Sequence, residues 1–153
     1  MREILFRGKR IDNRKWVKGY LIKWQDGTAT IETGDSCLPA RAVIPETVGQ
    51  YTGLHDATKW ESLAEKERQE FLRNHKKEDW KGRQIFEGDI IKRFWLGAEI
   101  IYCVQYDGEN ASFIGKAMNK RGFTTFDNDG EMFEIIGNIH DNPELLEVKN
   151  AKE

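Results

Sequence analysis

The sequence alternates short aromatic and β-branched runs with turn-forming residues, and this pattern constrains the fold more than any other feature. Runs of this kind form short strands, and Asp26-Gly27 and Asp107-Gly108 are two-residue signals typical of β-hairpins. Further turns are expected at 12–13, 88–89 and 127–130. The expected strands are 3–6, 16–24, 28–33, 84–86, 90–95, 99–106, 112–117, 122–126 and 132–139.

Many short strands with frequent turns predict a mainly β fold, either a small barrel or a sandwich of antiparallel strands, with one inserted helix. The run 15–24 is partly apolar on both of its faces, which suits a barrel wall or a strand between two layers. Residues 58–75 contain no Gly or Pro and are rich in helix formers. Thr58 with Glu61 and Ser62 with Glu65 form possible capping boxes for this helix.

The expected helix has a modest apolar stripe, formed by Trp60, Leu63, Ala64 and Phe71. Such a stripe predicts a helix that docks on its own domain; the alternative is a helix that binds a partner. We expect one β domain over residues 1–148 with a helical insertion at about 58–80, followed by a short polar tail at 149–153.

Composition and cysteine usage point to a reducing compartment. A chain of 153 residues is long enough to fold without disulfides or metal. Cys37 and Cys103 lie far apart and form no CxxC motif, and the charged opening residues 1–10 do not resemble a signal peptide. No stretch approaches the length of an apolar membrane span. We expect a cytoplasmic, globular protein without membrane association, in which Cys103 is a buried and unreactive thiol.

The formal net charge of −2 argues against a protein whose main task is to coat nucleic acid. The charge is nevertheless unevenly distributed, because residues 1–23 carry a net +6 and residues 107–153 a net −5. This uneven distribution of charge fits either a surface that binds a partner or an attraction between the basic and acidic ends of the chain. The candidate binding residues are the basic and aromatic ones of a single expected hairpin, where cations and rings suit phosphates and bases: Lys15, Trp16, Lys18, Tyr20, Lys23 and Trp24.

No candidate motif for catalysis, a metal or a cofactor has the residue spacing that its chemistry requires. Residues 108–116 place six residues between their glycines, where a phosphate loop needs four, and Ala117 follows the lysine. The acids near 127–130 lack the glutamate that closes a calcium loop, and Ile136 stands there instead. The histidines His55, His75 and His140 are scattered along the chain. We therefore expect no enzyme activity, no bound metal and no cofactor.

Three blocks resemble the YopX family of small phage and prophage proteins. Residues 49–56 (GQYTGLHD), 82–91 (GRQIFEGDII) and 135–146 (IIGNIHDNPELL) are similar to its QYTGLKD, GKEIYEGDIV and VIGNIYENPELL motifs, in the same order. The opening MREILFR also fits. The resemblance implies a phage or prophage context inside a bacterial host and an unknown biochemical activity. The helical segment at 58–80 departs from the family pattern, and an insertion at a turn between strands is thermodynamically cheap.

The motif residues have plain structural explanations. Glycines at 53, 88 and 137 suit turns or bulges with positive φ, and Asp or Asn in turns hydrogen-bonds nearby backbone amides. We expect structural roles, with binding roles as the alternative, for Gln50, Tyr51, Gly53, Gly88, Asp89, Gly137, Asn138 and His140. The sequence thus predicts an accessory protein that acts by binding a protein partner or its own copies. A small β-barrel that binds nucleic acid through its basic N-terminal third is the alternative.

Overall fold

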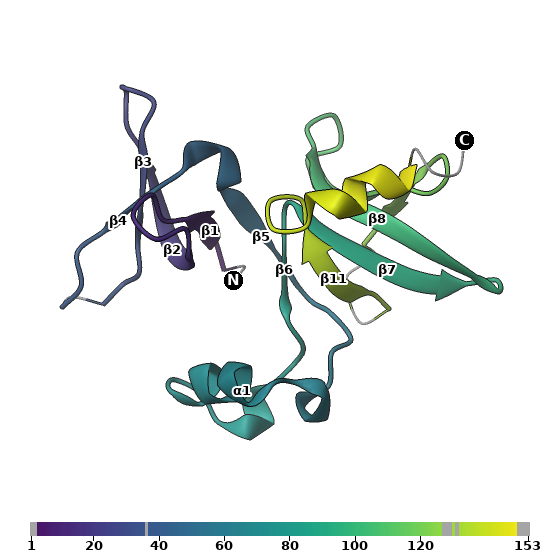
Figure 1. Ribbon diagram of the computed structural model, residues 1–153, viewed down its shortest axis with the longest axis horizontal. Helices are drawn as coiled ribbons and strands as arrows, with labels where there is room; N and C mark the ends of the chain where they lie inside the picture. Colours follow the sequence, from purple (N-terminus) through teal and green to yellow (C-terminus); the bar gives the residue numbers. More distant parts are fainter. Residues whose placement is uncertain (1–2, 36, 127–129, 131, 150–153) are drawn as a thin grey trace.

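The computed structural model describes residues 3–35, 37–126, 130 and 132–149, and the chain in it is mainly β. Two antiparallel sheets lie at opposite ends of the molecule, and the helical segment lies below their junction in the view of Figure 1. The sheets do not close on themselves, so the barrel that the sequence suggests is not confirmed. The expected turn at 127–130 and most of the tail at 149–153 fall outside the described residues.

The first sheet contains six strands in the order β4-β3-β2-β1-β5-β6. Its central pairings join segments that are distant in sequence, since Phe6 pairs with both Gly19 and Gln50. The Asp26-Gly27 hairpin forms as expected, with Gly27 at a φ of +89°. The strands are β1 (Phe6–Lys9), β2 (Trp16–Lys23), β3 (Ala29–Glu32), β4 (Arg41–Val43), β5 (Gly49–His55) and β6 (Gln84–Phe86).

The second sheet contains five strands in the order β10-β9-β8-β7-β11. Its centre is a long hairpin of β7 and β8, and the Asp107-Gly108 signal joins β8 to β9 as the sequence predicts. A bulge between Ile135 and Gly137 interrupts the pairing of β11 with β7. The strands are β7 (Asp89–Trp95), β8 (Ala98–Asp107), β9 (Ser112–Ala117), β10 (Phe123–Thr125) and β11 (Glu134–Asn138).

The apolar core is divided between the sheets. Ala29, Ile31 and Val43 form a small cluster in the first sheet. A larger cluster around Tyr102 and Val104 fills the second sheet, and Ile85 of β6 belongs to it, so the last strand of the first sheet is packed into the core of the second. Cys103 is buried, as expected, and burial raises the pKa of its thiol.

The helical segment is shorter and more broken than its composition predicts. Instead of one helix over 58–75, the chain forms two short 3-10 turns around the helix α1 (Glu65–Leu72). Neither expected capping box forms at its start: Ala64 is the N-cap without a side-chain hydrogen bond, and the Thr58 hydroxyl donates to Asp56. The 3-10 turns are η1 (Pro45–Thr47), η2 (Trp60–Ser62), η3 (Lys77–Asp79) and η4 (Pro143–Lys149).

The apolar residues of the segment gather into one cluster that joins α1 to the turns on either side of it. Trp60, Phe71 and Trp80 pack edge-to-face with centroids 5.1–6.0 Å apart. His75 stacks on Phe71 at 4.6 Å, and Leu63 is buried. Edge-to-face packing adds to the burial of each ring. The segment is therefore held together largely by its own aromatic cluster.

Candidate binding cleft

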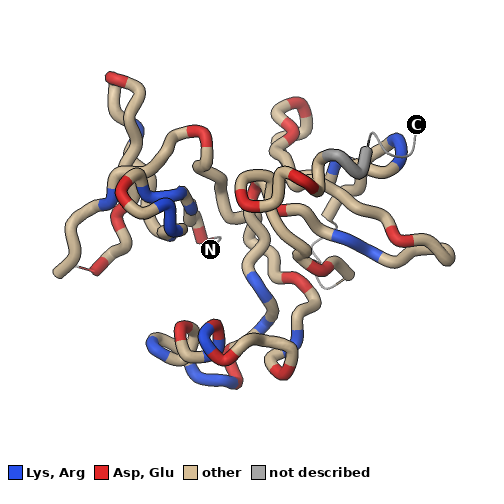
Figure 2. Tube along the Cα trace, viewed as in Figure 1, with Lys and Arg blue, Asp and Glu red and all other residues tan. Residues whose placement is uncertain are grey.

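A cleft of about 1030 Å³ lies at the junction of the two sheets. One wall is formed by β1, β2 and β6 of the first sheet, and the helical segment forms the facing wall. Residues of β11 and the turn after it line the remaining side. Figure 2 shows Lys and Arg gathered on the strands of the first sheet, while residues of both signs cover the helical segment.

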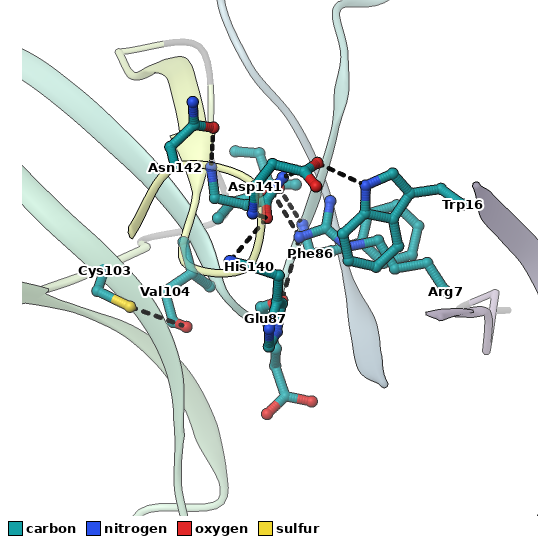
Figure 3. Close-up of polar contacts among 12 residues, drawn as sticks. Arg7, Trp16, Phe86, Glu87, Cys103, Val104, His140, Asp141 and Asn142 are labelled. Carbon is teal, nitrogen blue, oxygen red and sulfur yellow. Dashed lines mark hydrogen bonds and ion pairs between the residues drawn. The ribbon is translucent and has the colours of Figure 1, made fainter. Parts of the chain in front are cut away.

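A buried ion pair joins the two sheets at the inner end of the cleft. Arg7 Nη2 on β1 lies 2.7 Å from Asp89 Oδ1 on β7. The guanidinium is sandwiched between rings, 4.6 Å from the centroid of Trp16 and 4.9 Å from that of Phe86 (Figure 3). The other oxygen of Asp89 accepts the Phe86 amide at 2.8 Å. These contacts satisfy both oxygens of a carboxylate that is almost fully buried.

A second connection runs from the first sheet to the turn after β11. Asp141 accepts a hydrogen bond from the indole Nε1 of Trp16 at 2.7 Å (Figure 3). It also accepts the side-chain amide of Asn138 at 3.0 Å, and it pairs with Lys9. Burial raises the pKa of Asp141, but the hydrogen bonds from Lys9, Trp16 and Asn138 outweigh that effect and lower it to about 2. The two oppositely charged ends of the chain thus meet through Lys9 and Asp141.

Lys18 is placed differently from the other cations of the cleft. Its Nζ donates to Gln84 Oε1 at 3.3 Å and lies 5.2 Å from the Phe86 ring centroid, but it forms no ion pair with any residue that the structure describes. Much of the side chain is exposed, whereas its ammonium end lies within the cleft. The loss of water there lowers the pKa of Lys18, and the charge of Arg7 adds to this effect.

The facing wall is tied to the first sheet by Arg83 and Glu67. Arg83 donates from Nε and Nη2 to the two carboxylate oxygens of Glu67, at 2.9 and 3.0 Å. This two-pronged hydrogen bond raises the pKa of Arg83. Such paired geometry is stronger and more specific than a single contact. Two of the cations that line the cleft, Arg7 and Arg83, are therefore already neutralised.

Asp56 closes the neck of the helical segment, and no local pattern in the sequence singles it out from its block. It is 1% exposed and accepts the backbone amides of Thr58, Arg83 and Ile135 and the Thr58 hydroxyl. At the same crossing, a Cβ on Gly82 would lie 2.0 Å from the Asp56 carbonyl oxygen. One carboxylate thereby connects β5, the start of the segment, β6 and β11.

The structure divides the candidate residues of the N-terminal hairpin into two groups. Trp16 and Lys18 line the cleft, and the ring of Trp16 is engaged by Arg7, Lys9 and Asp141. The remaining four are exposed and lie outside the cleft lining: Lys15, Tyr20, Lys23 and Trp24.

The residues singled out in the three sequence blocks also fall into two groups, those that line the cleft and those that do not. Asp89, Gly137 and Asn138 line the cleft, whereas Gln50, Gly53, Gly88 and His140 do not. Asn138 Oδ1 accepts the amides of His140 and Asp141, and Gly53 and Gly88 have a φ of +88°.

Gly137 differs from expectation in detail. It lies at the bulge, but its φ is not positive; it is constrained by space, because a Cβ there would lie 2.5 Å from Asn142 Oδ1. The Tyr51 ring is buried and packs 5.5 Å from Phe86. Burial, with the charge of Glu3, raises the pKa of Tyr51 to about 12. Its hydroxyl lies 3.4 Å from His55 Nδ1.

Metal and membrane features can be stated only for the described part of the chain. Within residues 3–35, 37–126, 130 and 132–149, no group of three His, Cys, Asp or Glu is placed to hold a metal ion. His55 and His75 both line the cleft, while His140 packs near Trp16 with ring centroids 6.0 Å apart. Over the same residues, no helix is long and apolar enough to cross a membrane.

The fold and the cleft define a mainly β protein with two open sheets and a polar cleft at their junction. Residues 75–147 match the family model described as YopX protein. This range contains the second and third sequence blocks, and the match supports the assignment to the YopX family that these blocks suggested. The first block and the opening residues lie outside the matched range. A search of curated proteins found no match.

Proposed function

We propose that this YopX-family protein is a phage- or prophage-encoded accessory protein that works in the bacterial cytoplasm by binding a protein partner, which includes its own copies. The observation that carries the proposal is the tip of the β7–β8 hairpin. Phe94, Trp95 and Leu96 are 73%, 46% and 88% exposed, although they are consecutive and apolar. A partner that covers them would gain about 25 cal/mol for each Å² of apolar surface removed from water.

The backbone at this tip adds a second reason. Trp95 pairs with Ala98, so the loop consists of Leu96 and Gly97, and both have positive φ, at 49° and 80°. Asn, Asp and Gly are the residues that suit the first position of such a loop. A leucine held there costs about 1–2 kcal/mol of backbone strain. Folding alone favours a different residue at this position, so the strained and exposed Leu96 is a reason to propose a binding role for the tip.

The proposal also holds that the protein performs no chemical step. Among the described residues that line the cleft there is no Ser, Thr or Cys to act as a nucleophile. Arg7 and Arg83, two of its cations, are committed to ion pairs with Asp89 and Glu67. A pair of fixed, neutralised charges suits the positioning of the sheets better than proton transfer.

A second candidate function is supported by the outer surface of β2. Tyr20 and Lys23 on β2 and Trp24 directly after it are all exposed, and exposed rings and cations suit single-stranded nucleic acid. A mobility-shift titration at two salt concentrations tests it. Binding should weaken steeply with salt and after Lys23→Glu. The absence of binding at low salt would remove this candidate.

The test of the main proposal combines self-association with affinity capture. Sedimentation measures whether the purified protein associates with itself, and capture from bacterial lysate with mass spectrometry measures enrichment of other proteins. We expect one of the two, and we expect the double variant Phe94→Ser/Leu96→Ser to abolish it. Tyr106→Ser, which changes an exposed aromatic residue near the far end of β8, is the matched control and should change neither readout. Neither association nor enrichment with the unaltered protein would contradict the proposal.

A further inference from the structure

The cleft at the sheet junction is a second site, separate from the tip of the β7–β8 hairpin, and its charges are not balanced locally. Its described lining contains the basic residues Arg7, Lys18, Lys81 and Arg83 and six acidic residues. Of the four cations, Arg7 and Arg83 hold carboxylates at 2.7 and 2.9 Å. Lys18 and Lys81 are both exposed and neither has a counter-ion among the described residues, but Lys18 lies beside Gln84 and Phe86 on the sheet wall of the cleft. Lys18 is thus the cation that is placed to receive an arriving anion.

The surroundings of Lys18 favour a ligand with an apolar body. The ring of Phe86 lies 5.2 Å from its Nζ, and Trp16 belongs to the same wall. Phe71 and Trp80 line the facing wall, and Ile135 and Ile136 line the third side. Apolar and aromatic surface beside convergent polar groups is a common feature of small-ligand sites.

One polar group beside Lys18 can complete the recognition of an anion. The amide of Gln84, whose oxygen accepts from Lys18, also carries an NH₂ that can donate. A carboxylate bound there would form a charge-assisted hydrogen bond with the Lys18 ammonium. Partial burial in the cleft lowers the pKa of Lys18, and the charge of Arg7 adds to this effect.

The acidic residues of the cleft limit the negative charge that a ligand can carry. Acidic residues exceed basic ones along the lining by two, and Glu70 and Asp79 stand on the facing wall. A dianion such as a phosphate monoester would be repelled by them, whereas a single negative charge can be neutralised by Lys18. We propose that this cleft binds a monoanionic carboxylate attached to an apolar or aromatic body, with Lys18 as the anchor of the carboxylate.

The carboxylate can come from a free organic acid or from the carboxyl end of a polypeptide, and two probes distinguish these sources. The first is 3-phenylpropionate, and the second is the tripeptide acetyl-Gly-Gly-Phe with a free carboxyl group. Binding is followed by NMR through the indole N–H of Trp16 and the amides of Gln84 and Phe86. We expect saturable shifts centred on these signals with both probes. A tripeptide affinity about tenfold above that of 3-phenylpropionate identifies a polypeptide end; equal affinities identify a free acid.

Charge-matched probes and variants test the role of Lys18. The amide of the tripeptide, phenethylammonium and benzyl phosphate should each bind at least about tenfold more weakly than the corresponding carboxylate. Lys18→Gln should weaken carboxylate binding about tenfold or more, since it removes a charge-assisted hydrogen bond. Lys18→Arg should restore most of the affinity. Lys23→Gln, on the same strand but outside the cleft lining, is the matched control and should bind as the unaltered protein does.

The proposal is overturned if neither carboxylate shifts the Trp16, Gln84 and Phe86 signals. It is overturned equally if Lys18→Gln binds them as tightly as the unaltered protein, or if phenethylammonium or benzyl phosphate binds as well as 3-phenylpropionate. None of these results bears on the hairpin tip, because Phe94, Trp95 and Leu96 do not line the cleft.

Discussion

The guanidinium of Arg7 lies 2.7 Å from the carboxylate of Asp89, and this buried ion pair joins β1 of the first sheet to β7 of the second. Removing one partner of such a pair leaves an uncompensated charge in the interior, which costs about 3–5 kcal/mol. We therefore expect Asp89→Asn to lower the free energy of unfolding by about that amount, as measured by urea denaturation.

The control for this prediction is Asp12→Asn, which breaks the exposed ion pair between Arg10 and Asp12. Exposed pairs contribute about 0–1 kcal/mol, so this variant should be nearly as stable as the unaltered protein. Equal losses in the two variants would mean that the junction of the sheets does not depend on the buried pair.

Asp56 should stabilise the helical segment as well as the fold as a whole. Asp56→Ala removes the acceptor of hydrogen bonds from Thr58, Arg83 and Ile135 and leaves these amides unsatisfied, each at about 1–3 kcal/mol. Limited proteolysis should then cut within residues 58–81 much faster than before. Asp107→Ala, which removes a carboxylate that accepts hydrogen bonds in an exposed hairpin loop, should leave this segment protected. Unchanged cleavage in Asp56→Ala would show that the neck is held in another way.

Alanine substitutions at two glycines with positive φ distinguish the cost of backbone strain alone from the cost of strain plus a steric clash. Gly97 has a φ of +80° and open space around its Cβ position, so Gly97→Ala should cost only the strain, about 1 kcal/mol. Gly82 has a φ of +110°, and a Cβ there would lie 2.0 Å from the carbonyl oxygen of Asp56. Gly82→Ala should therefore cost at least about 3 kcal/mol, because overpacking adds to the strain. Thermal unfolding of the two variants in parallel measures the difference, and similar losses would refute the close approach at the neck.

The stability of the protein should fall with pH in the acid range partly through Asp141. Its pKa in the folded chain is about 2, below the value of about 3.9 for an unfolded aspartate. The stabilisation is therefore complete above about pH 5 and is lost as the pH falls towards 2.

Because the carboxyl side chain is 38% exposed, solvent screening reduces the contribution of Asp141 to about 1 kcal/mol. Asp141→Asn should be less stable than the unaltered protein at neutral pH and equal to it near pH 2, and its unfolding free energy should fall less steeply between pH 5 and 2. An unchanged slope would contradict the assignment. The exposed Glu46→Gln is the control.

Local signals in the sequence predicted most of the strands because these signals act over a few residues, but β4 and β5 were not predicted, and the first strand, expected at 3–6, forms at Phe6–Lys9. The strand at 112–117 forms with the expected bounds, and the Asp26-Gly27 and Asp107-Gly108 hairpins form where their turn chemistry places them. The helix prediction failed at its ends, since composition does not reveal that Trp60, Phe71 and Trp80 pack as a cluster.

Contacts between segments that are distant in sequence could not be predicted from such local signals. The pairing of Phe6 with Gln50 and the neck at Asp56 depend on segments that are distant in sequence, and no periodicity reports them. The cleft could not be predicted for the same reason. Trp16 and Lys18 were predicted as parts of a basic hairpin, but the facing wall, which contains Phe71 and Trp80, comes from the helical segment. A leucine at the first position of a two-residue hairpin loop was the one local sign of the exposed tip.

The most direct test of the central claim is a single substitution at that tip. Leu96→Asn places a residue that suits positive φ in the loop while removing the most exposed apolar side chain. We predict that the free energy of unfolding rises by about 1 kcal/mol, whereas capture of the partner or self-association falls to background. A Leu96→Asn protein that binds as well as the unaltered protein would contradict the claim that the hairpin tip is the binding anchor.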